Sequence, residues 1–423
     1  MAAKSAMEAR MKDDLKRYVL SKDVIRETVS GSRQVLRNSF TGMRLKVSLE
    51  TIRLLTAFEN RAMTRAEAAE YFQINDSQGI NLLNELLDSL LESTILLPAE
   101  EALLFQQEKL QEQLTKNPFT LPRVTLGDCP GLQLINLKPK TIVIGGAPID
   151  LGTTTLPGSR GGPDSLRESS VQFITYGKNF SSGDDNGWYN ADTQSVILKN
   201  RRLADVGNIA VRPGEGLKEL HQRCYQGAAE IFFRKCLPAF IGGDHSISAP
   251  LVKAYCDTIG GDVTIVQFDA HTDTAGWDSF VLSHHGNVIS KILAENEKAK
   301  VIQYGIRGFS GQPLNNSRCV TFSQRQLLLG KDISEIIPKQ KRCYITIDVD
   351  VLDPVFALGT GTPVPLGMYP HQLLNILYKV VEFNDVIGID IVELNPLVDL
   401  NKTTSSLFFH ILMCLLGWID ARG

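Results

Sequence analysis

Three side chains that could bind a metal ion stand at alternate positions in the segment Gln267–Asp273. Asp269, His271 and Asp273 follow an apolar run over residues 263–268. In an extended strand, side chains two residues apart leave on the same face, so we expect these three to converge where a buried strand ends. Two carboxylates and an imidazole at one spot repel and desolvate one another unless a cation lies between them. The spacing predicts a metal site, although a polar strand end is an equal alternative for this motif taken alone.

Two further clusters of the same kind occur in the chain, Gly242–Ser246 (G-G-D-H-S) and Asp348–Pro354 (D-V-D-V-L-D-P). Each follows an apolar run, over residues 237–241 and 343–347 respectively. In open parallel sheets, ligands bind at the carboxyl ends of the strands. Four of the seven histidines fall within residues 245–285, which a random scatter would not favour. The three clusters together are a strong signal for a metal centre at one edge of a sheet.

With these motifs, the chain resembles the ureohydrolase family of arginases and agmatinases, which hydrolyse guanidino groups to urea at a two-manganese centre. The similarity runs from about Ile142 to the C-terminus and does not cover the first 140 residues or so. Besides the three clusters, it takes in Pro148-Ile149-Asp150, Pro157-Gly158-Ser159-Arg160, Asp205-Val206-Gly207, Thr360-Gly361-Thr362-Pro363 and Glu393-Leu394-Asn395-Pro396. So many matches in the same order leave little room for chance.

The resemblance implies six metal ligands, each carried over from a matching motif position: His245, Asp269, His271, Asp273, Asp348 and Asp350. One ion would take His245, Asp269, Asp273 and Asp348, and the other would take Asp269, His271, Asp348 and Asp350. Asp269 and Asp348 would then bridge the ions. Two imidazoles among four carboxylates suit two manganese ions per chain, while nickel, iron and cobalt stay open on ligand identity alone. Two adjacent divalent ions would lower the pKa of a shared water and hold the resulting hydroxide.

The resemblance also assigns catalytic roles outside the ligand set. Glu393 would pair with the guanidinium and orient it, and Asp273 counts as catalytic as well as ligating. His285 stands where the family keeps a proton-shuttling histidine, but the neighbouring His284 leaves the assignment between the two open. Asp244 is expected to support a ligand by accepting hydrogen bonds.

Substrate contacts are expected from Glu393, Trp277, Asp278 and Thr362. Arginases grip the amino-acid end of free arginine partly with an asparagine two residues beyond the D-A-H-x-D motif. This chain has Ala275 at that position. The departure argues against free L-arginine as the substrate, although not against hydrolysis of a guanidino group.

The elements that must position these residues can be predicted from apolar patterns. After residue 140, short apolar runs alternate with helical patterns. The predicted strands are 141–146, 237–241, 263–268, 300–305, 343–347 and 386–391, and the predicted helices are 163–176, 214–234, 247–258, 285–294, 369–383 and 404–421. This alternation predicts an α/β fold with a mostly parallel sheet between two helix layers, which is also the three-layer α/β/α fold of the resembled family.

The first 139 residues are predicted to form smaller parts. Residues 1–45 are interpreted as a helical arm, 46–100 as a winged-helix-like module of three short helices and a strand at 94–98, and 101–139 as a helix and linker before the hydrolase domain at 140–423. The second helix of the module starts with a capping box at Thr64. The module carries four basic and nine acidic residues, and a net charge of −5 would repel nucleic-acid phosphates.

The whole chain has the composition of an ordinary globular protein, with 43% hydrophobic and 22% charged residues and a net charge of −3. Its seven cysteines include no C-x-x-C pair, which favours reduced thiols and a cytoplasmic location. The longest apolar run, over residues 407–419, is too short to span a membrane and contains His410. We expect no nucleic-acid or membrane partner, and a homo-oligomer.

Three functional hypotheses remain open. The first is metal-dependent hydrolysis of a guanidino group, leaning to arginine within a precursor peptide, with urea and ornithine as products. Its alternative is a free guanidino compound such as agmatine or arginine. The peptide version rests on the acidic N-terminal module, which resembles modules that hold leader peptides and could bind a strand at 95–97. A second class is an inactive binding or regulatory relative, and the intact ligand set argues against it. A third keeps the enzyme but changes the bond, for example to a formimino group.

Overall fold

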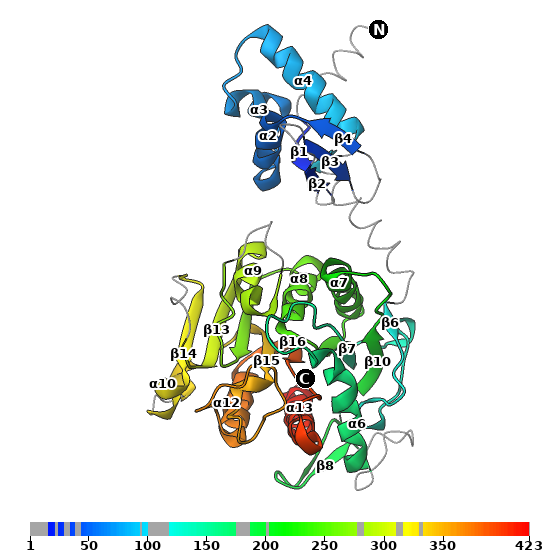
Figure 1. The fold of residues 1–423 in the computed structure, drawn as a ribbon, viewed down its shortest axis with the longest axis vertical. Coiled ribbons are helices and arrows are strands. Elements are labelled where there is room, and N and C mark those ends of the chain that lie inside the picture. Colours follow the sequence, from blue (N-terminus) through cyan, green and yellow to red (C-terminus); the bar gives the residue numbers. More distant parts are fainter. Residues whose placement is uncertain are drawn as a thin grey trace. The chain divides into compact units, whose positions relative to one another are not determined.

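The computed structural model describes residues 16–21, 24–28, 34–38, 44–93, 95–99, 118–174, 187–199, 203–276, 283–309, 316–329 and 333–422 of the chain. The chain divides into two compact units, an N-terminal unit (Met1–Thr115) and a C-terminal unit (Lys116–Gly423). Both units are drawn in Figure 1.

The C-terminal unit is built on a nine-stranded sheet with the order β14-β13-β12-β15-β16-β11-β7-β10-β6. All neighbouring strands are parallel except β6, which pairs antiparallel with β10. The central strands are continuous apolar runs because helices cover both of their faces. The strands are β6 (Phe119–Thr120), β7 (Ile142–Ala147), β10 (Leu203–Ile209), β11 (Leu237–Gly242), β12 (Val263–Phe268), β13 (Ala299–Ile306), β14 (Cys319–Ser323), β15 (Arg342–Asp348) and β16 (Asp385–Val392).

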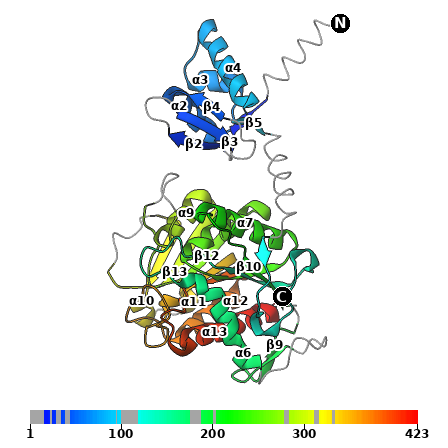
Figure 2. The ribbon, with the colours of Figure 1, turned by 45° about the vertical axis from the view of Figure 1, so that its right-hand side comes forward.

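Two layers of helices enclose this sheet, as Figures 1 and 2 show from two directions. One layer holds α7 (Leu217–Phe233), α8 (Ser248–Thr258) and α9 (Val288–Glu295), and the other holds α6 (Gly162–Ile174), α12 (Pro370–Phe383) and α13 (Thr403–Arg422). The shorter elements are α10 (Gln324–Leu328), α11 (Ile333–Ile336), the hairpin β8 (Trp188–Asn190) and β9 (Ser195–Ile197), and the 3-10 turns η1 (Leu126–Asp128), η2 (Leu134–Asn136), η3 (Ser159–Gly161), η5 (His245–Ile247), η6 (His285–Asn287), η7 (Val349–Val351) and η8 (Leu400–Lys402). The predicted three-layer α/β/α fold is confirmed.

Each face of the sheet has its own hydrophobic core because strand side chains alternate between the two faces. In β7, for example, Ile142 and Ile144 pack on the side of α6, α12 and α13, while Val143 packs on the side of α7, α8 and α9. Among the described residues, the stretch Leu400–Arg422 is long and apolar enough to cross a membrane, and 72% of its most apolar window is buried within the fold. Helix α13 therefore serves as a core helix of this unit.

In its described residues, the N-terminal unit combines three helices with two small antiparallel sheets. One sheet pairs β1 with β5, and the other has the order β2-β3-β4. The predicted capping box at Thr64 is confirmed, because its side chain accepts from the Glu67 N–H and the Glu67 carboxylate accepts from the Thr64 N–H. The elements are β1 (Tyr18–Leu20), β2 (Val24–Thr28), β3 (Gln34–Asn38), β4 (Arg44–Val47), α2 (Leu49–Asn60), α3 (Arg65–Tyr71), α4 (Ser77–Glu92) and β5 (Leu96–Pro98). The winged-helix comparison stays a prediction.

Two predictions about the first 139 residues are wrong. The helical arm at 1–45 is instead a set of short strands over residues 18–47, while residues 1–15 lie outside the described part of the chain. The side chain of Leu45 is partly buried and that of Val47 is buried. These positions are two residues apart, which is the period of a strand, and this spacing outweighs the weak helical pattern. The linker at 101–139 is also misplaced: residues 100–117 are not described, but Phe119 and Leu126 are buried in the C-terminal unit, which begins at Lys116.

Candidate metal centre

Four adjacent strands in the middle of the sheet deliver the predicted ligands to one edge. Phe268 of β12 lies beside Ile347 of β15, which lies beside Ile391 of β16, which lies beside Ile241 of β11. The four strands are parallel and reach this level together, so the residues that follow each strand meet at the same place. These residues are His245 after β11, Asp269, His271 and Asp273 after β12, Asp348 and Asp350 at and after the end of β15, and Glu393 after β16.

Five of the six predicted ligands come together in two groups that share one carboxylate. In the first group, His245 Nδ1 lies 2.9 Å from Asp273 Oδ2 and 3.2 Å from Asp269 Oδ2. In the second group, His271 Nδ1 lies 2.9 Å from Asp350 Oδ2 and 3.6 Å from the other oxygen of Asp269. Each group keeps its ligand atoms within 4.8 Å of one another. Asp269 therefore has one oxygen facing each group, as a bridging ligand would.

Asp348 lies at the edge of the first group. Its Oδ2 is 3.6 Å from His245 Nδ1, and its Oδ1 accepts the backbone N–H of Asp350 at 2.9 Å. The structure thus brings Asp348 to the centre with the other five residues. Its role as a second bridging ligand rests on the family resemblance.

The donor atoms of His245 fit a divalent cation. The Nδ1 atom of His245 is buried and has no hydrogen-bond partner among the described residues. On the other side of the ring, Nε2 lies 2.8 Å from the hydroxyl of Thr346, which donates its own hydrogen to Asp390 at 2.6 Å. Because that hydroxyl is already a donor to Asp390, it accepts from Nε2–H, and the lone pair of His245 is left on Nδ1. A lone pair that faces three carboxylates requires a positive charge between them.

The electrostatics of the cluster without an ion lead to the same conclusion. Burial raises the pKa of Asp348 well above its ordinary value, and the charges of Asp350 and Asp269 raise it further. Burial lowers the pKa of His271, but hydrogen bonds to Asp269 and Asp350 outweigh it and bring the pKa to about 12. Without cations the cluster would therefore have to hold extra protons, as the raised pKa values of Asp348 and His271 indicate. Two divalent ions would balance the four carboxylate charges.

Polar residues inside the strands hold the ligands in place, and the sequence patterns did not identify them. Gln267 Nε2 donates to Asp269 Oδ2 at 2.7 Å, and Gln303 Nε2 donates to the side-chain oxygen Oε1 of Gln267 at 2.7 Å. Arg307 donates to six backbone carbonyls, including that of Asp350 at 2.6 Å. The sequence did contain a signal for these supporting residues, because a polar side chain inside an otherwise apolar strand, as at Gln267 and Gln303, needs a buried hydrogen-bond partner.

The structure distinguishes the two neighbouring histidines. His285 Nδ1 lies 3.2 Å from Glu393 Oε1, and the same oxygen accepts the backbone N–H of His245 at 2.9 Å. The Nδ1 atom of His284 is buried without a hydrogen-bond partner in the described part of the chain. His285 is therefore the histidine that faces the centre. Glu393 and Asp273 have φ angles of 63° and 49°, a left-handed conformation that for non-glycine residues concentrates at functional sites.

The predicted substrate contacts are described only in part. Trp277 and Asp278 lie outside the described residues. The hydroxyl of Thr362 donates to Asp350 Oδ2 at 3.2 Å, so here Thr362 supports a metal ligand. Asp244 accepts the N–H of Gly152 at 2.7 Å and hydrogen bonds from Ser246, and neither partner is a predicted ligand, so its supporting role stays a prediction.

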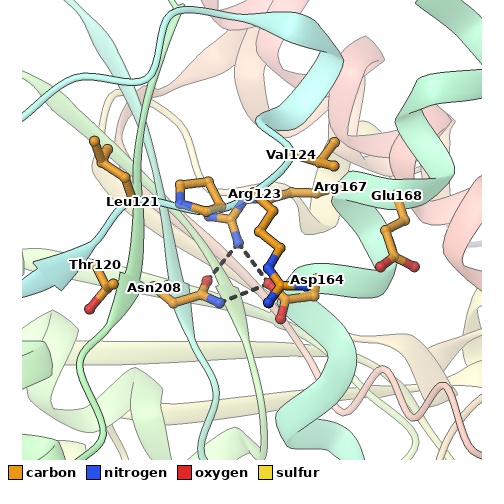
Figure 3. Close-up of a pocket in the computed structure, with 9 residues that line it drawn as sticks. Thr120, Leu121, Arg123, Val124, Asp164, Arg167, Glu168 and Asn208 are labelled. Atoms are coloured by element: carbon orange, nitrogen blue, oxygen red, sulfur yellow. Dashed lines mark hydrogen bonds and ion pairs between the residues drawn. The ribbon is translucent and has the colours of Figure 1, made fainter.

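A cavity of about 340 Å³ lies beside β6 and the start of α6, and none of its lining residues is a predicted site residue (Figure 3). Several of its polar groups are paired with one another or with residues next to the cavity. Arg167 binds Asp205 at 2.8 Å, and Asn208 donates to Asp164 at 2.8 Å. The lining residues are Thr120, Leu121, Pro122, Arg123, Val124, Asp164, Arg167, Glu168 and Asn208. The cavity therefore covers a structural ion-pair network and is distinct from the metal centre.

Comparisons with known proteins agree with this description. The family model of the Arginase family matches residues 140–417. The chain is 31% identical over 286 residues to the mitochondrial guanidino acid hydrolase of Homo sapiens, covering 64% of this chain and 76% of that protein. It is also 31% identical over 288 residues to the mitochondrial agmatinase of Gallus gallus, covering 64% of this chain and 80% of that protein.

Solved structures show the same likeness in the fold. The proclavaminate amidino hydrolase of Streptomyces clavuligerus matches with a TM-score of 0.60 at 25% identity, covering 73% of this chain and 100% of that chain. A hypothetical agmatinase from Burkholderia thailandensis matches with a TM-score of 0.59 at 26% identity, covering 68% of this chain and 88% of that chain.

Proposed function

The chain belongs to the arginase family, and from this premise we propose that it hydrolyses the guanidino group of a small free molecule to urea and an amine. The observation that carries the proposal is the pair of ligand groups that share Asp269, with the His245 lone pair directed at carboxylates. An inactive relative would have no need to keep this buried, mutually repelling set of side chains.

The residues present fit two divalent ions, and we propose manganese. His245, Asp269 and Asp273 would hold one ion, and Asp269, His271 and Asp350 would hold the other, with Asp348 beside them. A set of carboxylates with two imidazoles and no thiolate suits manganese. Such a pair of ions, when bound, supplies a hydroxide at a pH near neutrality.

Two residues beside the ligands would handle the substrate. Glu393 is buried at the centre and carries the negative charge that a guanidinium would pair with, which fixes the position of the guanidino carbon. The departing amine is a poor leaving group unless it gains a proton. His285 would provide this proton: burial lowers its pKa, but the hydrogen bond and charge of Glu393 outweigh burial and raise the pKa above its ordinary value.

The similar relatives favour a free guanidino compound over arginine within a peptide. Those relatives are named guanidino acid hydrolases and agmatinases, and both kinds are equally similar to this chain. The peptide version relied on strand addition at residues 95–97, and one edge of Leu96–Pro98 is already paired with β1. We therefore propose a free guanidino acid or agmatine as the substrate. Since four of the similar relatives are named mitochondrial, the cytoplasmic location stays a prediction. The homo-oligomer stays a prediction as well.

The test is a urea assay on purified full-length protein loaded with Mn²⁺. The panel holds 4-guanidinobutyrate, 3-guanidinopropionate, agmatine, L-arginine and an arginine-containing peptide, with Asp269→Asn as the inactive control, and formiminoglutamate is tested separately by release of formamide. We expect urea release to be fastest with a free guanidino acid or agmatine. Faster turnover of the peptide would overturn the substrate class. Absence of urea from every guanidino compound, with two ions bound per chain, would overturn the function itself.

A further inference from the structure

Thr154 lies against His285 on a loop that the core of the unit holds in place. The N–H of Gly152 donates to the buried carboxylate of Asp244 at 2.7 Å, and the backbone N–H of His285 donates to the carbonyl of Gly152 at 3.0 Å. The two chain segments are thus joined two residues before Thr154. This anchoring fixes the position of Thr154 relative to the imidazole of His285.

Both nitrogens of His285 have partners, and these partners decide which nitrogen carries the proton. The backbone N–H of Thr154 points at Nε2 from 3.1 Å, and the hydroxyl of Thr154 lies 2.7 Å from the same atom. Nδ1 lies 3.2 Å from Glu393 Oε1. A backbone N–H can only donate and a carboxylate can only accept, so in the neutral ring Nε2 accepts and Nδ1–H donates.

The protonated ring has a different requirement at Nε2. Its new Nε2–H needs an acceptor, which the backbone N–H of Thr154 cannot provide. A threonine hydroxyl can rotate and act either as donor or as acceptor. The hydroxyl of Thr154 can therefore satisfy Nε2 in both states, and because Thr154 is exposed it also connects Nε2 with solvent.

We propose that Thr154 is a positioning residue for His285, whose hydroxyl donates to the neutral ring and accepts from the protonated ring. This inference rests on the proposed function, in which His285 gives a proton to the departing amine. The hydroxyl keeps the ring in one orientation while its charge changes. The charged groups facing His285 are Glu393, Asp273 and Asp244, and the ring of His284 is its titratable neighbour.

Three variants separate this role from a structural one. Thr154→Val removes the hydroxyl and keeps the shape, Thr154→Ser restores the hydroxyl, and Thr155→Val makes the same change at the adjacent exposed position. In Thr154→Val, we expect the alkaline limb of the kcat profile, where His285 loses its proton, to move down by about one pH unit, the shift expected for losing one hydrogen bond to a charged group. Above that pH, kcat falls about tenfold while KM stays within about twofold. Thr154→Ser and Thr155→Val keep the wild-type profile.

A second measurement does not depend on substrate turnover. Diethyl pyrocarbonate reacts with unprotonated imidazole, so the pH at which His285 becomes half-reactive reports its proton binding in the metal-loaded enzyme. Peptide sequencing by mass spectrometry distinguishes His285 from His284, which serves as the internal reference. We expect the His285 midpoint to fall by about one pH unit in Thr154→Val alone.

The outcomes are distinct for the two proposals. If the His285 midpoint in Thr154→Val equals that in Thr155→Val, Thr154 does not act on the ring and the inference is overturned. If the wild type releases no urea from any guanidino compound, the proposed function fails, while the modification midpoints still decide the role of Thr154.

Discussion

Replacing Asp269 by asparagine tests whether one carboxylate serves both metal ions. Asp269 belongs to both ligand groups, whereas Asp273 belongs to the first and Asp350 to the second. We expect Asp269→Asn to lose both ions, and Asp273→Asn and Asp350→Asn to lose one ion each. Elemental analysis after gel filtration would then give about two, one, one and zero ions per chain for the wild type, Asp273→Asn, Asp350→Asn and Asp269→Asn.

The same argument gives the size of the effect on stability. An ion that binds only the folded state stabilises it by about 2.7 kcal/mol when its free concentration is 100 times its dissociation constant, so two sites contribute about 5.4 kcal/mol. In a domain of this size, each kcal/mol shifts Tm by about 2 °C. A chelator should therefore lower Tm by about 10 °C in the wild type and by about 5 °C in Asp273→Asn and Asp350→Asn. In Asp269→Asn it should have almost no effect.

The difference between the chelated and metal-loaded state of each variant is the quantity to measure, because asparagine has a cost of its own. The two oxygens of Asp269 accept the N–H of His271 at 2.5 Å and of Gln267 Nε2 at 2.7 Å. An amide NH₂ in that place would face one of these donors, at a cost of about 1–3 kcal/mol. Calorimetry of each variant with and without chelator cancels this term. An Asp269→Asn protein that keeps one ion and half of the chelator-sensitive Tm would refute the shared carboxylate.

Three other predictions test individual side chains. His285→Asn should lower kcat by about 10²–10⁴-fold with two ions still bound, whereas His284→Asn should stay within about threefold; the reverse order in a urea assay would contradict the assignment. Burial lowers the pKa of His221 to about 3, below its unfolded value, so its contribution to stability is present above pH ~6.5 and is lost as the pH falls. Urea denaturation should show the wild type losing about 3 kcal/mol more than His221→Gln between pH 7 and pH 4, and parallel losses would count against a buried neutral ring. Arg167→Met leaves the buried carboxylate of Asp205 unpaired and should lower the free energy of unfolding by about 3–5 kcal/mol. Lys402→Met breaks the exposed ion pair with Glu168 and should lower it by less than about 1 kcal/mol; equal losses in urea denaturation would show that burial does not decide the cost.

The sequence predicts the central sheet well because each strand there is one uninterrupted apolar run. Strand β12 has the same bounds as its prediction, 263–268, and five other predicted strands differ by at most one residue at either end. Strand β10 (Leu203–Ile209) was missed because Asp205 and Gly207 interrupt its apolar pattern. Asp205 is nevertheless fully buried, since Arg167 pairs with it through two nitrogens at 2.8 and 2.9 Å. The partner that allows this acid to be buried inside a strand is 38 residues away in the sequence, so a local pattern cannot show it.

The side chains that the sequence predicts as ligands do lie together, whereas the residues that support them were not predicted. The spacing of the residues predicts the ligands, because Asp269, His271 and Asp273 alternate at the end of a strand. The choice between His284 and His285 depends on which of the two side chains the backbone at the start of η6 turns toward Glu393. The sequence of two adjacent histidines does not show this. A supporting residue such as Thr346 is a single polar side chain, and its role depends on a hydrogen-bond partner in another strand, here Asp390 in β16. The short strands at residues 18–47 were missed for the same reason, since their pairing is not local.

The position of β16 sets the order in which this protein can be assembled during translation. Among the described strands it leaves the ribosome last, yet it lies at the centre of the sheet between β15 and β11. Until Val392 has been synthesised, the chain can form only two partial sheets, one carrying Asp269 and Asp348 and the other carrying His245. Each partial sheet ends in an unpaired apolar strand, which is prone to pair with other chains. The first ligand group, which takes His245 from one partial sheet and Asp269 and Asp273 from the other, therefore cannot assemble before synthesis is nearly complete. The second group, Asp269, His271 and Asp350, comes from one partial sheet alone.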